Sequence, residues 1–129
     1  METPLRAALL DWLRADPVLA DAVNVVTEEA PLRASPPWLG VVASASADWS
    51  TKDRVGREVR VALELHCRGD DAATAADLVA AIEARIESLP RAHAGFAIVT
   101  TQFLRARAES RANNQRAVLL EYRFRLLAS

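Results

Sequence analysis

The chain contains little glycine and little cysteine, and both shortages exclude some kinds of chemistry. None of its four glycines belongs to a P-loop or to a dinucleotide-binding pattern, so nucleotide binding through either motif is excluded. The single cysteine, Cys67, cannot form a disulfide within the chain, and a reducing cytoplasm is the simplest place of synthesis. There is no long apolar run and no basic leader before an apolar stretch, so we expect neither a membrane span nor a secretory signal.

Length and charge narrow the class further. A chain of 129 residues, of which 51% are hydrophobic, is long enough to bury its own core, and it shows no internal repeat or linker. We therefore expect a single domain over residues 1–129. The net charge of -1 gives no reason to expect tight non-specific binding to nucleic acid or to an anionic membrane.

Two stretches alternate apolar and polar side chains with a period of two residues. In residues 58–68 the apolar positions are Val59, Val61, Leu63, Leu65 and Cys67, and in residues 118–127 they are Val118, Leu120, Tyr122, Phe124 and Leu126. This pattern predicts strands with one face in a core. The other face carries charges of both signs and suits either solvent or a neighbouring copy. The pattern favours a chain that associates rather than one that catalyses.

Helical spacing marks three other segments. The stripe of Leu5, Leu9, Trp12 and Leu13 follows the start signal Thr3-Pro4, and Asp16-Pro17 begins a second helix over residues 18–23. A third helix follows Gly69-Asp70-Asp71 and stops at Pro90. Its expected buried stripe consists of Ala75, Leu78, Val79, Ile82, Ile86 and Leu89.

The remaining segments complete the predicted fold. Strands are expected at residues 24–28, 38–46 and 96–106, and polar loops at residues 48–56 and 107–115. In the strand at 38–46 we expect Leu39, Val41, Ala43 and Ala45 on one face. In the strand at 96–106 we expect Phe96, Ile98 and Leu104 on one side, with Val99 and Phe103 on the other. The fold class is therefore α+β, with a mostly antiparallel sheet of about four to five strands and helices packed on one face.

Soft side chains do not form a catalytic or metal-binding pattern. His66 and Cys67 are adjacent in a predicted strand, so they point to opposite faces and cannot easily share a metal ion. The phase of the strand buries Cys67, which argues against a nucleophile pair with His93. We expect no catalytic, cofactor-binding or metal-ligating residue, no cofactor, and a protein that is not an enzyme.

Candidate contact residues lie in the two polar loops and on the charged side of the alternating strands. For contacts with partner proteins they are Trp49, Lys52, Arg54, Arg107, Arg111, Asn113 and Asn114. For a subunit interface they are Arg60, Glu64, Glu121, Arg123 and Arg125. The arginines of the last third of the chain would also suit a nucleic-acid groove. Few aromatic residues interleave them, however, and arginine is favoured at protein interfaces, which favours the interface.

Several local features together resemble a known family. They are Pro4-Leu5-Arg6-Ala7-Ala8-Leu9-Leu10, Leu13-Arg14-Ala15-Asp16-Pro17-Val18-Leu19-Ala20, the Pro36-Pro37-Trp38 entry into a strand, the alternating strand followed by an alanine-rich helix, and the closing Tyr122-Arg123-Phe124-Arg125. In element order the chain resembles the tail terminator, or tail-completion, proteins of long-tailed phages and of phage-derived gene transfer agents. The resemblance extends over nearly the whole chain and includes no catalytic motif.

The resemblance implies a structural protein of the tail of a virion or gene transfer agent particle, made in the bacterial cytoplasm. Such proteins form a homo-hexameric ring that ends polymerisation of the tail tube protein and docks onto the head-tail connector, or stopper, protein. Double-stranded DNA then passes through the hole. Two alternatives stay open: a small-molecule-binding regulatory α+β domain and, more weakly, a small hydrolase with its site at a dimer interface.

Overall fold

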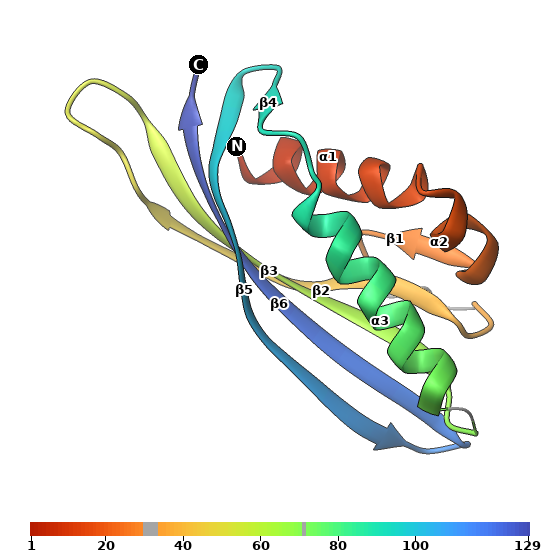
Figure 1. The fold of residues 1–129 in the computed structure, drawn as a ribbon. Helices are drawn as coiled ribbons and strands as arrows, with labels where there is room; N and C mark the ends of the chain where they lie inside the picture. Colours follow the sequence, from red (N-terminus) through yellow and green to blue (C-terminus); the bar gives the residue numbers. More distant parts are fainter. Residues whose placement is uncertain (30–33, 71) are drawn as a thin grey trace.

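A computed structural model describes residues 1–29, 34–70 and 72–129, and it has three helices beside one strongly twisted sheet (Figure 1). The helices are α1 (Glu2–Arg14), α2 (Pro17–Ala22) and α3 (Ala72–Glu87). The strands are β1 (Val25–Thr27), β2 (Trp38–Asp48), β3 (Gly56–Arg68), β4 (Ala92–His93), β5 (Phe96–Arg111) and β6 (Gln115–Ala128). The expected α+β class, with helices packed on one face of the sheet, is confirmed.

The sheet has six strands in the order β1-β2-β3-β6-β5-β4, more than the four to five expected. The additional strand is β4, which pairs only Ala92 and His93 with β5 and is too short to show a periodic pattern. All neighbouring strands are antiparallel except β1 and β2, which run parallel over three residue pairs. The sheet is therefore mostly antiparallel, as expected.

The core lies between the helices and one side of the sheet, which we call the helix side. Strands β3 and β6 are paired along their whole length, and the pairs Val59↔Phe124 and Leu63↔Leu120 are fully buried on this side. Helices α1 and α3 cover them (Figure 1). Their buried residues are Leu5, Leu9, Leu10, Leu13, Ala75, Leu78, Ile82 and Ile86, with Trp12 and Val79 packed at the margin. The predicted packing of these two helices on the alternating strand is confirmed.

Helices α1 and α3 are joined by Trp12 and Arg85. The Trp12 indole donates hydrogen bonds to the Arg85 carbonyl oxygen at 2.9 Å and to Ser88 Oγ at 3.0 Å. Arg85 Nε donates to the Trp12 carbonyl oxygen at 2.7 Å, and its guanidinium lies 3.6 Å from the indole centroid. Such cation–π contacts contribute about 0.5–2 kcal/mol, so this reciprocal contact helps to fix the angle between the two helices.

Two of the expected helix starts can be compared with the structure. Helix α1 begins at Glu2 with Met1 as its N-cap, so the expected start at Thr3-Pro4 is wrong by two residues. Asp16 caps α2 as expected, because its carboxylate accepts a hydrogen bond from the Leu19 amide at 3.2 Å. Asp71, expected before α3, lies outside the described residues.

A bulge at Val42 divides β2 into two parts. Leu39 and Val41 pair with Leu65 and Leu63 on the helix side, but beyond the bulge Ser44 and Ser46 take that side opposite Val61 and Val59. The expectation that Ala43 and Ala45 share the face of Leu39 is therefore wrong. One extra residue reverses the alternation, and sequence periodicity alone does not reveal it.

Strand β5 has two similar irregularities, near Val99 and Leu104. Phe103 pairs with the buried Tyr122, so it shares the helix side with Phe96 and Ile98 rather than opposing them. The sequence expectation for Phe103 was wrong because the first irregularity inverts the phase of the strand. Phe103 remains 42% exposed on that side.

The expected polar loop at residues 107–115 is largely strand. Strand β5 continues to Arg111, β6 begins at Gln115, and only residues 112–114 form the turn. Asn113 and Asn114 have φ angles of 62° and 54°, a left-handed conformation that asparagine tolerates better than most residues. The charged side chains of this segment therefore lie on the sheet, where they had been assigned to a loop. The other expected loop is confirmed between β2 and β3.

We predict that Leu63→Asp prevents folding, because Leu63 is fully buried at the centre of β3. An unpaired buried charge costs several kcal/mol, against a total stability of about 5–15 kcal/mol for a domain. Ala45→Asp, on the exposed opposite side of β2, is the matched control and should fold normally. Circular dichroism melts decide between the outcomes. A soluble Leu63→Asp protein with an unchanged melting midpoint would show that the core lies elsewhere.

Candidate interaction surfaces

The side of the sheet opposite the helices, called here the charged face, gathers side chains from β3, β5 and β6. The strand register places seven arginines and four glutamates on it. These are Arg60, Arg68, Arg105, Arg107, Arg111, Arg123 and Arg125, with Glu58, Glu64, Glu109 and Glu121. All five residues predicted for a subunit interface, Arg60, Glu64, Glu121, Arg123 and Arg125, lie together here. Whether they contact a neighbouring copy stays a prediction.

Ion pairs within the chain hold most of these side chains in place. Arg105 Nε lies 2.8 Å from a Glu121 oxygen, and Arg125 Nε lies 3.1 Å from a Glu58 oxygen. Glu109 accepts from Arg107 at 2.9 Å and from Arg111 at 3.1 Å. Exposed pairs of this kind contribute about 0–1 kcal/mol each, so they orient the charged face more than they stabilise the fold.

Arg60 and Arg123 form an exception at the centre of the charged face. They are directly opposite each other on β3 and β6, and like charges in this position repel. Arg123 donates a hydrogen bond to the amide oxygen of Gln102, but among the described residues neither arginine has a carboxylate partner. This pair therefore provides a concentrated positive charge that an external anion could neutralise.

Charge is distributed unequally between the two sides of the molecule. The three helices contain the acidic residues Glu2, Asp11, Asp21, Asp77, Glu83 and Glu87 but only the arginines Arg6, Arg14 and Arg85. The charged face has the opposite excess. The near-zero net charge of the chain therefore conceals a negative helix layer and a positive sheet face, which composition alone could not reveal.

The loop between β2 and β3 is an ordered hairpin end. Trp49 N donates to the Gly56 carbonyl oxygen at 3.0 Å, Thr51 N to the Arg54 carbonyl oxygen at 2.8 Å, and Gly56 N to Ser50 Oγ at 3.0 Å. A side chain at Gly56 would place a Cβ 2.3 Å from the Trp49 carbonyl oxygen, so this close turn requires glycine. The loop therefore presents its tip in a defined conformation.

The predicted contact residues of the two loops lie apart. Lys52 and Arg54 are exposed at the tip of the β2–β3 hairpin, whereas Trp49 is half-buried, with the Arg125 guanidinium 5.5 Å from its ring centroid. Asn113 and Asn114 are at the β5–β6 turn, at the opposite end of the sheet (Figure 1). These five residues thus form two separate surfaces, and the other two predicted contact residues, Arg107 and Arg111, lie on the charged face.

The five residues predicted for the subunit interface leave out Arg68, Arg105, Glu58 and Glu109, which the strand register also places on the charged face. A signal was present for two of them, because residues 105–111 alternate strictly between charged and small side chains, as Arg-Ala-Arg-Ala-Glu-Ser-Arg. That pattern is typical of a strand with one polar face. The pattern was not interpreted as a strand because residues 107–115 were assigned to a loop.

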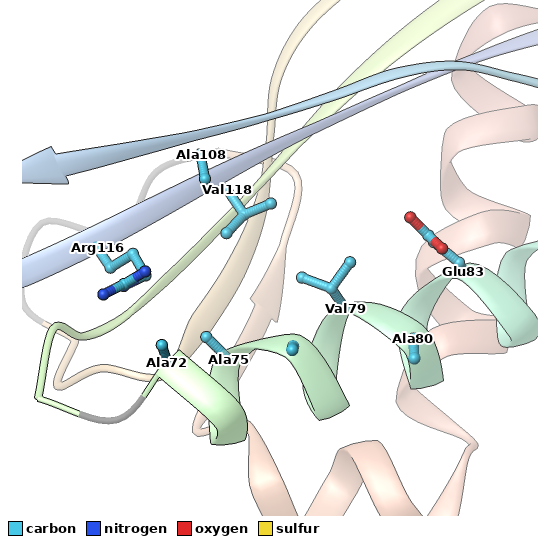
Figure 2. A pocket seen from close by; sticks show the side chains of 9 residues that line it. Ala72, Ala75, Val79, Ala80, Glu83, Ala108, Arg116 and Val118 are labelled. Carbon is cyan, nitrogen blue, oxygen red and sulfur yellow. The ribbon is translucent and has the colours of Figure 1, made fainter.

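A groove of about 350 Å³ lies between α3 and the β5–β6 hairpin (Figure 2). Its wall consists mainly of alanines from α3, with Val79, Val118 and Ala108. Figure 2 shows its two charged side chains, Arg116 and Glu83, at opposite ends. A small-molecule site needs polar groups that converge on one ligand, and these do not, so the groove gives no support to the regulatory-domain alternative.

The histidines and the cysteine have structural surroundings. Cys67 is buried, and desolvation raises the pKa of its thiol, the reverse of what an activated nucleophile needs. His66 stacks on Trp38 with ring centroids 4.0 Å apart, and His93 stacks on Phe96 at 4.8 Å. Within the described ranges no three His, Cys, Asp or Glu side chains are grouped so as to hold a metal ion.

Tyr122 is a fully buried core residue whose side chain carries a polar group, the phenol hydroxyl. Its hydroxyl is buried beneath α3 and has no hydrogen-bond partner among the described residues. Desolvation, with Glu83 and Glu87 as smaller contributors, raises the pKa of Tyr122. The hydroxyl is therefore held neutral at any physiological pH.

These surfaces define a protein that acts through contacts with other macromolecules, since its distinctive groups lie on an exposed sheet face and at hairpin ends. No helix among the described residues is long and apolar enough to cross a membrane. Residues 7–127 match the family described as Tail completion protein gp17. The chain therefore belongs to this tail completion family, and the resemblance noted in its sequence is confirmed.

A solved structure shows the same fold in a particle. The structure described as "Virion of native gene transfer agent (GTA) particle" contains a chain with a TM-score of 0.79 and 27% sequence identity to this one. The match covers 98% of this chain and 96% of that chain. A comparison with curated protein sequences gives no match. Family and structure together place the chain among the structural proteins of the virion tail.

We predict that Arg125→Leu lowers the free energy of unfolding by about 1 kcal/mol, because it removes both the ion pair to Glu58 and the cation–π contact to Trp49. Arg107→Leu is the matched control, since Arg107 is more exposed and pairs only with Glu109, two residues away on its own strand. It should change stability by less than about 0.5 kcal/mol. Urea unfolding of both variants measures the difference. Equal losses of stability in the two variants would show that the contacts of Arg125 with Glu58 and Trp49 do not stabilise the fold.

Proposed function

We propose that this protein is a tail terminator. In this proposal it forms a hexameric ring at the head-proximal end of the tail tube, where it ends tube polymerisation and joins the tube to the head connector. DNA passes through the ring during delivery, and the protein itself catalyses no reaction. The observation that carries the proposal is the agreement between the family match over residues 7–127 and the match over 98% of the chain to a protein of a gene transfer agent virion.

The two separated loop surfaces support a protein that joins partners on opposite sides. A ring between tube and connector needs one contact surface above and one below. The β2–β3 hairpin tip with Lys52 and Arg54, and the β5–β6 turn with Asn113 and Asn114, lie at opposite ends of the long strands. We propose that one end contacts the tail tube protein and the other the connector protein.

The charge balance of the charged face supports the proposal that double-stranded DNA passes along it. Arginines exceed glutamates there, so the surface attracts phosphate, but ion pairs already occupy most of the arginines. A strongly basic channel would retain DNA, because each phosphate contact adds binding free energy. We propose that this face is exposed to the DNA and makes weak, salt-sensitive and sequence-independent contacts through Arg60 and Arg123.

The decisive test is electron cryomicroscopy of tails purified from particles that carry this protein. We expect six copies in one ring at the head-proximal end of the tube and, in particles stopped during delivery, duplex density through its centre. Particles lacking the protein should have tails that are not joined to heads. Density for this chain at any other position, or with another symmetry, would contradict the proposal.

A second test addresses the hairpin tip. Trp49→Ala combined with Lys52→Ala should reduce the number of complete particles, because tryptophan is among the residues that most often anchor protein interfaces. Asp21→Ala, at an exposed position of α2 away from both hairpin ends, serves as the control. Electron microscopy counts of joined heads and tails give the result, with circular dichroism to verify folding. A folded double variant that assembles normally would exclude this loop as a contact.

A further inference from the structure

The two outermost long strands, β2 and β5, each have an outer edge that is paired with another strand over only a few residues. Strand β1 pairs with β2 at Trp38, Leu39 and Gly40, and β4 pairs with β5 at Phe96 and Ala97. Among the described residues, no strand pairs with the outer edge of β2 over residues 42–48 or of β5 over residues 99–111. Figure 1 shows both stretches extending beyond the helices, with the β2–β3 hairpin projecting furthest.

The uncovered edge of β2 lacks most of the features that normally prevent edge-to-edge pairing. Soluble proteins protect such edges with lysine, proline, inward-pointing charges or a covering segment. From Val42 to Ala47 this edge contains only valine, alanine and serine, and the bulge at Val42 is its one irregularity. Small side chains on both faces let another backbone approach closely. In a free monomer this edge would be an aggregation hazard, which indicates that it is paired in the assembled state.

The uncovered edge of β5 is a suitable counterpart. After the irregularity near Leu104 the strand is regular from Arg105 to Arg111. Its arginine side chains lie on the charged face in ion pairs with Glu109 and Glu121, and its helix-side residues Ala106 and Ala108 are small. The edge itself, with its amide and carbonyl groups, remains accessible between them.

Strand direction determines how the two edges can meet. The four long strands β2, β3, β6 and β5 alternate in direction, so β2 and β5 run opposite to each other. A rotation about a ring axis preserves the direction of each strand relative to that axis. The β2 edge of one copy therefore meets the β5 edge of the next as an antiparallel pair, which continues the alternation of the sheet.

We propose that neighbouring subunits pair β5 of one copy with residues 42–48 of β2 of the next, so that their sheets join into one closed barrel. This inference rests on the proposed ring and identifies its interface. The contact is heterologous, because two different edges meet, and contacts of that kind give a ring when the rotation between copies closes after a whole number of subunits. The charged face is then the inner surface of a continuous barrel, as the proposed contact with DNA requires, and is not itself the contact between copies.

The size of such a barrel agrees with the proposed function. Six copies contribute roughly 24 strands, and a spacing of about 4.8 Å with a tilt near 40° gives a backbone diameter of about 48 Å. Side chains extend about 5 Å from a sheet, which leaves an opening of roughly 38 Å. Duplex DNA, about 20 Å across, passes through an opening of this width.

Cysteine cross-linking tests the edge pairing. Ser46 lies on the helix side of β2, and Thr101, Ala106 and Ala108 lie on the helix side of β5. The experiment combines Ser46→Cys with Thr101→Cys, Ala106→Cys or Ala108→Cys in turn, because the stagger between copies decides which position is opposite. Assembled tails are treated with a short bis-maleimide. Cys67 is buried and gives little background.

We expect at least one double variant to give a ladder of linked chains that ends at six on a denaturing gel, and each single variant to give none. Linked dimers from a single variant would show β2–β2 or β5–β5 pairing about a dyad and would overturn the proposal. Arg123→Cys, on the charged face, should not cross-link. Cross-linking at that position would overturn the proposal and support a subunit interface through the charged face, as predicted from the sequence.

The same experiment separates failure of the inference from failure of the proposed function. Tails with a six-fold ring of this protein, but no linked chains from any pair, would overturn the edge pairing and leave the terminator proposal intact. A linked ladder from protein that is absent from the tail end would uphold the edge pairing and overturn the terminator proposal. Absence of both would overturn both.

Discussion

The pairing of β3 with β6 is the constraint on which the rest of the structure depends. Their thirteen residue pairs, from Gly56↔Leu127 to Arg68↔Gln115, bring two alternating sequences into phase. Because side chains alternate between the two sides of a strand, a slip of one residue would put Leu120 and Tyr122 on the solvent side and Arg123 in the core. The register therefore follows from the burial of apolar side chains, and the placement of the helices follows from the register.

The same alternation that makes the core also makes the functional surface. Most buried residues of β3 and β6 have a charged or polar neighbour one position away, so the charged face is formed whenever the core is formed. The helices can cover only one side, and the other is left exposed with Arg60 and Arg123 opposite each other. In the proposed assembly such a protein needs no pocket, because its proposed contacts are spread over a sheet face, two hairpin ends and two strand edges.

Sequence periodicity predicted what depends on long regular patterns. The alternation in β3 and β6 and the helical stripes in α1 and α3 were strong enough to identify the core, and the family resemblance identified the class of protein. Periodicity failed where one extra residue changes the phase of a strand. The bulge at Val42 reversed the side on which Ala43 and Ala45 lie, and the irregularity near Val99 reversed the side of Phe103. Arg107 and Arg111 were assigned to a loop because residues 107–115 are polar or small and include no large apolar side chain to mark a buried face. The close opposition of Arg60 and Arg123 depends on a pairing of distant strands that periodicity does not specify.

The bulges that defeated the sequence prediction also explain why the open edges are selective. An extra residue at Val42 separates the part of β2 that belongs to the domain, paired with β1, from the part that projects with the hairpin. The irregularity near Leu104 similarly separates the part of β5 near β4 from its regular distal part. Each bulge interrupts the ladder, so an indiscriminate partner cannot pair along the whole edge. In the proposed ring, the two interrupted edges lie on opposite sides of an even number of antiparallel strands, so each can pair with the other edge of a second copy turned about a common axis.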